Sequence, residues 1–321
     1  MLNVVKNKKI FFTIPAVIIV LGVIFYFVHG GFNLDVDFTG GTNLQLDLGQ
    51  QFEVKDIENM VKGVVADANP SIVRGGEAGT EVTIKLKELT DEQSTEVLNA
   101  IREKYDPSYK AGEDVVVEDE KAQEGEDAAA AEEKTESKFK IYSRDTISAT
   151  IGGELRRSAF LSAIIAILLM LVYISFRFEF WSGIASIVAL THDVLVVLSI
   201  YAIFNLPMNT TFIAAILTIV GYSINATIVV FDRVRENNRF AKKTPFSEVI
   251  NKSVSQSITR TINTSITTLL SILTLFILGV SSIKQFSLPI IIGILVGAYS
   301  SITIASPVWF VLKGGDKKTA K

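Results

Sequence analysis

The chain has 321 residues, of which 49% are apolar and 20% are charged, and its formal net charge is −3. Its mean hydropathy of +0.38 is high for a soluble protein, in which about 25% of residues are charged. It has no cysteine, which excludes disulfide bonds, a thiolate nucleophile and cysteine metal sites. The sequence also lacks the HExxH motif of zinc proteases and the GxxxxGKS/T motif of P-loop nucleotide hydrolases.

Six stretches are apolar and long enough to cross a bilayer, which takes about 20 residues. Asp193, in the third stretch, is the only Asp, Glu, Lys or Arg among them. We therefore predict an α-helical membrane protein with six transmembrane helices, and a soluble enzyme is excluded. The stretches are 10–28, 159–176, 183–204, 210–231, 262–280 and 286–312.

Basic residues are unevenly distributed over the connections between these stretches. Three lysines precede the first stretch, whose 19 residues exceed the roughly 7 to 15 of a signal-peptide core, so it is interpreted as a retained anchor. The connection 232–261 and the end of the chain are rich in Lys and Arg, whereas 205–209 has neither. Because basic loops remain on the cytoplasmic side, both termini are predicted to be cytoplasmic.

This topology divides the chain into four parts. Residues 1–28 are the cytoplasmic N-terminus and first helix, 29–158 an extracytoplasmic domain, 159–312 a bundle of helices two to six, and 313–321 a basic cytoplasmic tail. The extracytoplasmic domain carries 28 acidic and 15 basic residues, a net charge of −13. Such a charge argues against nucleic acid as a partner.

The extracytoplasmic domain shows an α+β pattern. Its apolar spacing predicts the order β-α-β-β-α-β, which is the split βαβ pattern of a ferredoxin-like domain. The segment 106–137 contains EGEDAAAAEEKTE, which is acidic and rich in Ala, and is expected to be a mobile insertion. The predicted elements are strand 43–48, helix 53–67, strands 71–74 and 81–87, a helix from Thr90 or Asp91, and strand 139–142.

His192 and Asp193 lie ten residues into the third stretch, about 15 Å along a helix and so near the middle of the bilayer. An ionised carboxylate there costs roughly 2.5 to 3.5 kcal/mol and usually marks an ion pathway. Asp193 could bind and release a proton if water reached it. The alternative is a neutral Asp, alone or paired with His192, that holds helices together.

A polar stripe enters the fifth stretch. Arg260 within it either extends to the cytoplasmic surface or serves as a counter-ion inside the membrane. In the fourth stretch Asn225, one turn from Gly221, is a candidate hydrogen-bond partner or simple structural glue. Gly293 and Gly297, followed by Ser301, predict a packing face on the sixth stretch. The stripe, at helical spacing, consists of Ser253, Ser257, Arg260, Thr264, Thr267 and Ser271.

Several motifs resemble the SecF family of the resistance-nodulation-division (RND) superfamily: VDFTGGT at 36–42, ELRRSA at 154–159, THDV at 191–194, GYSINATIVVFDRVREN at 221–237 and SITRTINTS at 257–265. The resemblance covers nearly the whole chain except the insertion. It implies a bacterial membrane subunit that acts with SecD beside the SecYEG translocon and uses proton or sodium flow to draw out an unfolded polypeptide. The turn segment Asp37, Phe38, Thr39, Gly40, Gly41 and Thr42 would link the first helix to the outer domain, as a hinge or as a purely structural turn.

One position departs from the family. The family usually has Asp after the Asn of GYSIN, where it acts as a relay carboxylate paired with the fifth-helix Arg, here Arg260. This chain has Ala226. Three explanations remain: a relay carboxylate on SecD, which is favoured, Asp193 as the second choice, or an uncoupled subunit.

The predicted function is therefore a non-enzymatic accessory role in protein export, with SecD, SecYEG, the exported polypeptide and the lipid bilayer as partners. No cofactor is expected, because the membrane gradient would supply the energy, and no metal is expected, because the chain has no cysteine and its two histidines, His29 and His192, lie far apart. The alternatives are half of an RND-type exporter of small molecules or lipids, and an ion-uncoupled scaffold of the translocon.

Overall fold

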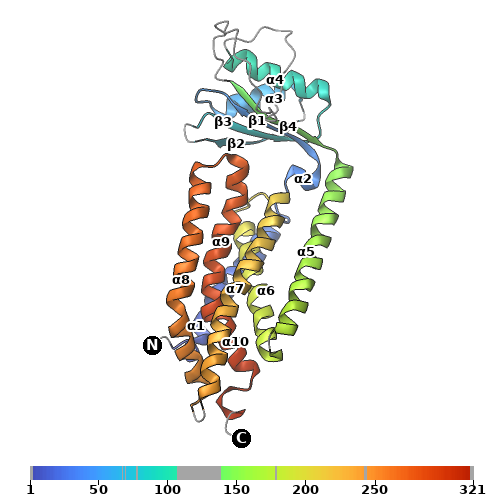
Figure 1. Ribbon diagram of the computed structural model, residues 1–321. Coiled ribbons are helices and arrows are strands. Elements are labelled where there is room, and N and C mark those ends of the chain that lie inside the picture. The colour runs from blue at the N-terminus through green and yellow to red at the C-terminus, as the bar shows by residue number, and fades with distance from the viewer. Residues whose placement is uncertain are drawn as a thin grey trace, which may run out of the picture. The chain divides into compact units, whose positions relative to one another are not determined.

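The computed structural model describes residues 3–66, 68, 70–76, 79–106, 139–177, 179–241 and 244–318. The chain forms two compact units (Figure 1). The helical unit comprises Met1–Asn33 and Ser158–Lys321, and the α/β unit comprises Leu34–Arg157. The predicted insertion 106–137 lies outside the described residues except for Asp106.

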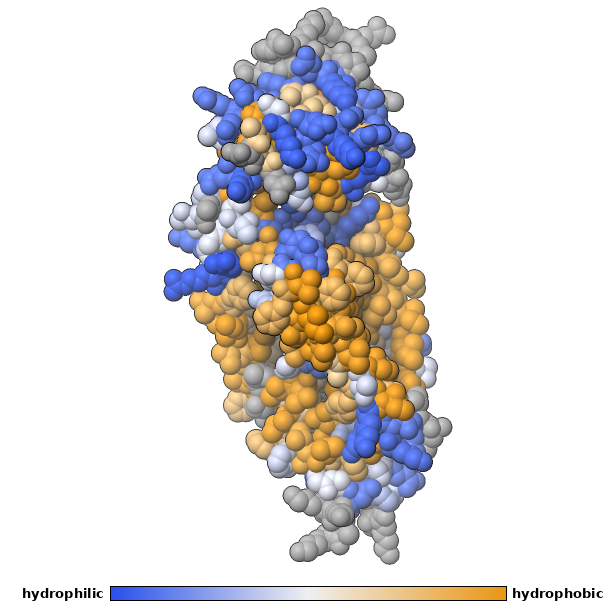
Figure 2. Space-filling model, turned by 180° about the vertical axis from the view of Figure 1, so that it is seen from behind, coloured by the Kyte–Doolittle hydropathy of each residue, from blue (hydrophilic) through white to orange (hydrophobic). Residues whose placement is uncertain are grey.

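Among the residues that the structure describes, six segments are long and apolar enough to span a membrane, which confirms the predicted number. Figure 2 shows apolar residues gathered over these helices. The helices are α1 Lys8–Val28, α5 Ala149–Arg177, α6 Phe180–Ile203, α7 Thr210–Phe240, α8 Phe246–Leu278, α9 Ser281–Thr303 and α10 Ala305–Leu312, followed by the short 3-10 helix η1 Gly315–Lys318.

The observed helices differ from the predicted stretches in three ways. Helices α7 and α8 have 31 and 33 residues, so at 1.5 Å per residue each exceeds the roughly 30 Å of the hydrocarbon core. Helix α5 begins at Ala149, ten residues before the apolar stretch. The sixth stretch is broken at Ile304 into α9 and α10, because Pro307 has no N–H to donate to the carbonyl of Thr303.

The α/β unit contains a four-stranded antiparallel sheet of order β2-β3-β1-β4 (Figure 1). Its elements follow the order β-α-β-β-α-β, with the additional short helix α2 before the first strand. The elements are α2 Val36–Thr39, β1 Gly41–Asp47, α3 Val54–Val64, β2 Ser71–Gly75, β3 Glu81–Leu86, α4 Asp91–Tyr105 and β4 Lys140–Ile147.

Helices α3 and α4 cover one face of this sheet. Alternate residues of β1 and β3 point to that face and meet the apolar sides of both helices. Leu44, Ile84, Ile57 and Leu98 are completely buried there. The side chains of this core come from six elements that are distant in sequence, so the unit has its own apolar interior.

Local sequence signals explain where most of these elements begin and end. Thr90 caps α4 through a capping box, in which its hydroxyl accepts from Gln93 N at 3.2 Å while the Gln93 side chain accepts from Thr90 N at 3.1 Å. Helix α3 ends at Val64, three residues before the predicted end at 67. Strand β4 extends to Ile147, five residues beyond the predicted 142, with a register shift opposite Gln45 and Leu46.

Candidate ion-coupling site

Asp193 lies on α6, on the side that contacts α7 and α9. Only 1% of its surface is exposed. Its Oδ2 accepts hydrogen bonds from Ser223 Oγ on α7 and from Ser300 Oγ on α9, the latter at 2.8 Å. His192 Nδ1 lies 2.9 Å from Asp193 Oδ1. We call His192, Asp193, Ser223 and Ser300 the Asp193 site.

Glycines on α9 allow the helices to come close enough to form this site. A Cβ atom on Gly293 would lie 2.3 Å from the Ile219 side chain, and one on Gly297 would lie 3.2 Å from Ser223 Cβ. The packing face predicted from Gly293 and Gly297 therefore lies against α7. Its effect is to hold Ser223 within hydrogen-bonding distance of Asp193.

The arrangement affects how many hydrogen bonds each protonation state of Asp193 can accept. An ionised carboxylate can accept both hydroxyl hydrogens and the imidazole N–H at once, whereas a protonated one loses part of this accepting capacity. His192 Nε2 is buried without a hydrogen-bond partner among the described residues. The site thus combines a buried carboxylate with an imidazole ring that contacts it through one nitrogen.

Arg260 and Asn225 are not part of the Asp193 site. Both are exposed on the surface of the chain, and Arg260 forms no ion pair with any described residue. A Cβ on Gly221 would meet no atom within 4 Å, so the expected neighbouring helix beside Asn225 is not provided by the described part of this chain. Ala226 is half-buried next to Asn225.

The predicted polar stripe on α8 separates into two sets. Its first two members, Ser253 and Ser257, are buried. The other four are exposed and form the set that we call the polar face: Arg260, Thr264, Thr267 and Ser271.

Two buried residues continue the row of Ser253 and Ser257 instead. They are Thr261 and Ser265, which sequence analysis missed. A spacing of four residues from Ser253 onward was the available signal.

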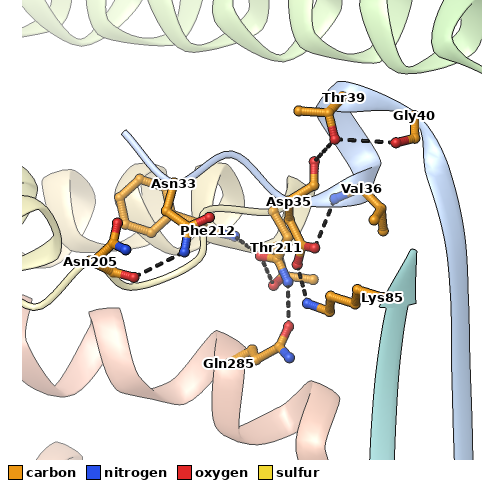
Figure 3. A network of polar contacts seen from close by, with 11 residues as sticks. Asn33, Asp35, Val36, Thr39, Gly40, Lys85, Asn205, Thr211, Phe212 and Gln285 are labelled. Atoms are coloured by element: carbon orange, nitrogen blue, oxygen red, sulfur yellow. Dashed lines mark hydrogen bonds and ion pairs between the residues drawn. The ribbon is translucent and has the colours of Figure 1, made fainter. Parts of the chain in front are cut away.

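The turn segment 37–42 is held in place by residues of the α/β unit. Asp35 caps α2, accepting from Val36 N at 2.8 Å, and forms a buried ion pair with Lys85 of β3 (Figure 3). Gly40 and Gly41 have φ of +77° and +148°, and a Cβ on Gly41 would lie 2.3 Å from the Leu86 carbonyl oxygen.

The ends of this segment also have defined roles. Thr42 is buried in β1, and its hydroxyl accepts from Leu89 N at 3.1 Å. Asp35, which the sequence analysis did not select, is the main anchor of the turn segment; an acidic residue directly before a short helix was the available signal.

Figure 3 also shows Asn33 in the helical unit, which donates to the Asn205 carbonyl at 3.0 Å.

These features define a polytopic membrane protein with an α/β domain and a carboxylate buried among its helices. A family model described as "Protein export membrane protein SecD/SecF, C-terminal" matches residues 127–315. The chain therefore belongs to the SecD/SecF family of protein export membrane proteins.

Individual relatives agree with this assignment. The protein translocase subunit SecF of Sebaldella termitidis is 34% identical over 97% of this chain and 92% of that protein. The subunit SecDF of Thermus thermophilus is 35% identical over 89% of this chain. This chain spans only 35% of the length of that protein. A crystal structure of SecDF from Thermus thermophilus, described as a translocon-associated membrane protein, matches with a TM-score of 0.77 and 33% identity over 97% of this chain and 38% of that one.

Proposed function

We propose that the chain is a SecF-type subunit of the protein export machinery, which acts with a SecD partner and uses a transmembrane ion gradient to promote late translocation of secreted polypeptides. The observation that carries this proposal is the Asp193 site. A carboxylate enclosed by three membrane helices, in a family of export proteins, is suited to couple a cation to helix movement.

The distribution of charge supports the proposed orientation in the membrane, and the strand order supports the proposed fold of the α/β unit. The basic connection between α7 and α8 favours a cytoplasmic position for both chain termini in a bacterial cytoplasmic membrane. The α/β unit is then the extracytoplasmic domain. Its strand order β2-β3-β1-β4 supports the ferredoxin-like fold, because the strands joined by α3 are separated by one antiparallel strand.

The polar face of α8 is the proposed contact with SecD. The guanidinium of Arg260 is costly to expose to lipid on a membrane helix, so a protein surface is expected to cover it and the face around it. This chain spans only about a third of the length of the relatives named SecDF. The remaining length of those relatives is enough for a second half that could supply such a surface. SecYEG and the emerging polypeptide are the further proposed partners.

Arg260 and Asp193 have separate roles in this proposal. With Ala226 in place of a carboxylate, Arg260 is free to pair with a carboxylate of SecD across the polar face. Asp193 is the cation-binding carboxylate of this chain. Energy comes from the ion gradient, which supplies about 2.3 kcal/mol per charge at 100 mV, and the role is not enzymatic.

The test compares Asp193→Asn with Arg260→Lys in proteoliposomes that contain SecYEG and the SecD partner. We expect Asp193→Asn to remove most of the gradient-dependent part of export and Arg260→Lys to have a smaller effect. Glu179→Gln, an exposed carboxylate at the N-cap of α6, is the matched control and should leave export unchanged.

Two results would contradict ion coupling through this site. Equal and mild effects of both substitutions would favour the uncoupled scaffold. Normal secretion in a deletion strain, together with altered drug sensitivity, would favour an exporter of small molecules or lipids.

A further inference from the structure

A row of buried hydroxyl groups runs along the contact between α7 and α8. Ser253, Ser257, Thr261 and Ser265 recur every four residues on α8, and all have less than 8% of their surface exposed. This spacing places them on one side of the helix. They face the protein interior, in contrast to the polar face.

The partners of this row on α7 follow from the antiparallel pairing of the two helices. Tyr222 Oη donates to Ser265 Oγ at 3.4 Å, and Asn237 Nδ2 donates to Ser253 Oγ at 2.8 Å. Thr227 lies five residues along α7 from Tyr222, and Thr261 lies four residues back along α8 from Ser265, so the antiparallel register places Thr227 and Thr261 at about the same level along the two helices.

The hydroxyl groups of Thr227 and Thr261 are unusual. Both residues are at most 2% exposed, and neither Oγ1 has a hydrogen-bond partner among the described residues. The exposed Thr264 and the half-buried Thr268 on α8, by comparison, donate to carbonyls of their own helix. A buried hydroxyl without a partner costs about 1 to 3 kcal/mol, and a buried water is the usual way to satisfy it.

The row is connected to the Asp193 site. Ser223 lies one turn from Thr227 on the same side of α7, where Cβ atoms are roughly 5 to 6 Å apart. Ser223 donates to Asp193 Oδ2. At the other end, Asn237 and Arg233 both contact Gln256, where the helices carry charged residues.

We propose that these hydroxyls form a water-containing path between the charged ends of α7 and α8 and Asp193, through which protons reach the carboxylate. We call Ser253, Ser257, Thr261, Thr227 and Ser223 the hydroxyl seam. A proton passes from water to water or hydroxyl and finally to Asp193 Oδ2, and no other group changes charge. This proposal rests on the proposed function of Asp193, and the alternative is a dry contact between small residues.

The absence of cysteine allows an accessibility test in the full chain, in membranes with its SecD partner. Thr261→Cys and Ser257→Cys would be treated with methanethiosulfonate ethylammonium from the side of Arg233. We expect modification of both, because this charged reagent reacts only with thiols in contact with water. Ala215→Cys, buried in an apolar contact of α7, is the control and should not react. If Thr261→Cys and Ser257→Cys react no faster than Ala215→Cys, the seam is dry and the proposal is wrong.

A second test uses Thr227→Val combined with Thr261→Val, which keeps the side-chain volume and removes both hydroxyls. We expect proton uptake by proteoliposomes to fall several-fold, with no rise in the unfolding temperature. Unchanged uptake with a higher unfolding temperature would instead show a dry contact that the methyl groups improve. The results distinguish failure of the two proposals. If the seam is accessible to water and Asp193→Asn leaves export unchanged, only the proposed role of Asp193 is wrong. If the seam is inaccessible and Asp193→Asn impairs export, only the proposed path is wrong.

Discussion

Asp193 illustrates how much of this protein depends on single small residues. Its carboxylate is held by hydroxyl groups from two other helices, and one of these, Ser223, is kept close by the missing side chain of Gly297. A buried carboxylate without such donors would be strongly disfavoured. Ser223 and Gly297 therefore matter through their position relative to Asp193, although neither carries charge.

Gly293→Ala is predicted to destabilise the helical unit. The added methyl would lie 2.3 Å from Ile219, so α7 and α9 must separate, at a cost of about 1 to 3 kcal/mol. Thermal unfolding of the detergent-solubilised chain measures the loss. Gly221→Ala is the control in the isolated chain, because no atom lies within 4 Å of its Cβ position. Equal unfolding temperatures for the two variants would contradict the close contact at Gly293.

Gly41→Ala is predicted to disrupt the turn before β1. The residue has a φ of +148°, and a Cβ would lie 2.3 Å from the Leu86 carbonyl oxygen. We expect loss of folded α/β domain, seen as protease sensitivity of the membrane-bound chain. Gly63→Ala on α3, where a Cβ meets nothing within 4 Å, should remain as resistant as the parent chain. Full resistance of Gly41→Ala would show that the strand can shift to accommodate the methyl.

Among the elements, α7 and α8 show how one helix can present two chemically different polar sides. The buried row of α8 is paired with α7, and the polar face is exposed. The exposed Thr264, Thr267 and Ser271 donate to carbonyls of α8 itself, so their hydroxyls are satisfied even without a partner. The Arg260 side chain has no hydrogen-bond or ion-pair partner among the described residues, so of the residues on this face it gains most from a neighbouring chain.

Helix α4 depends on its capping box. Thr90→Ala removes the hydroxyl that accepts from Gln93 N and is expected to lower the free energy of unfolding of the α/β domain by about 1 kcal/mol. Chemical denaturation followed by circular dichroism measures the change. Thr95→Ala is the control, because that hydroxyl is exposed and only donates to a carbonyl of the same helix. A loss for Thr95→Ala as large as that for Thr90→Ala would contradict the role of the cap.

In the whole molecule, the two units have separate apolar interiors. The core of the α/β unit is formed by its own strands and helices, and the helical unit is held by contacts between membrane helices. The chain enters and leaves the α/β unit at Leu34 and Arg157, so two connections join the units.

A fragment of residues 34–157 is accordingly predicted to fold without the membrane helices. Completely buried residues from several elements provide the driving force, for example Leu44, Ile84 and Leu98. Cooperative unfolding and dispersed amide resonances of the purified fragment would support this expectation. Leu98→Ala should then lower its stability by about 2 to 5 kcal/mol, as expected for a buried large-to-small substitution. A fragment without a cooperative transition would show that the helical unit contributes to the core.

Local patterns were sufficient for much of the architecture. The number of membrane helices follows from the transfer cost of each segment, which depends on its own composition. The capping box at Thr90 likewise needs only residues three apart. The extension of β4 to Ile147 was missed, because pairing with β1 rather than local alternation determines that end.

The amino-acid sequence by itself determined that this is a six-helix membrane protein of the SecD/SecF family and that Asp193 is exceptional, since both depend on residues read one segment at a time. Only the tertiary structure decided which polar groups surround Asp193, that Arg260 and Asn225 lie apart from it, and that the hydroxyls of Thr227 and Thr261 are buried without a partner among the described residues. Those relations depend on the rotation and register of helices against each other. They are set by packing between residues such as Gly293 and Ile219, which are distant in sequence.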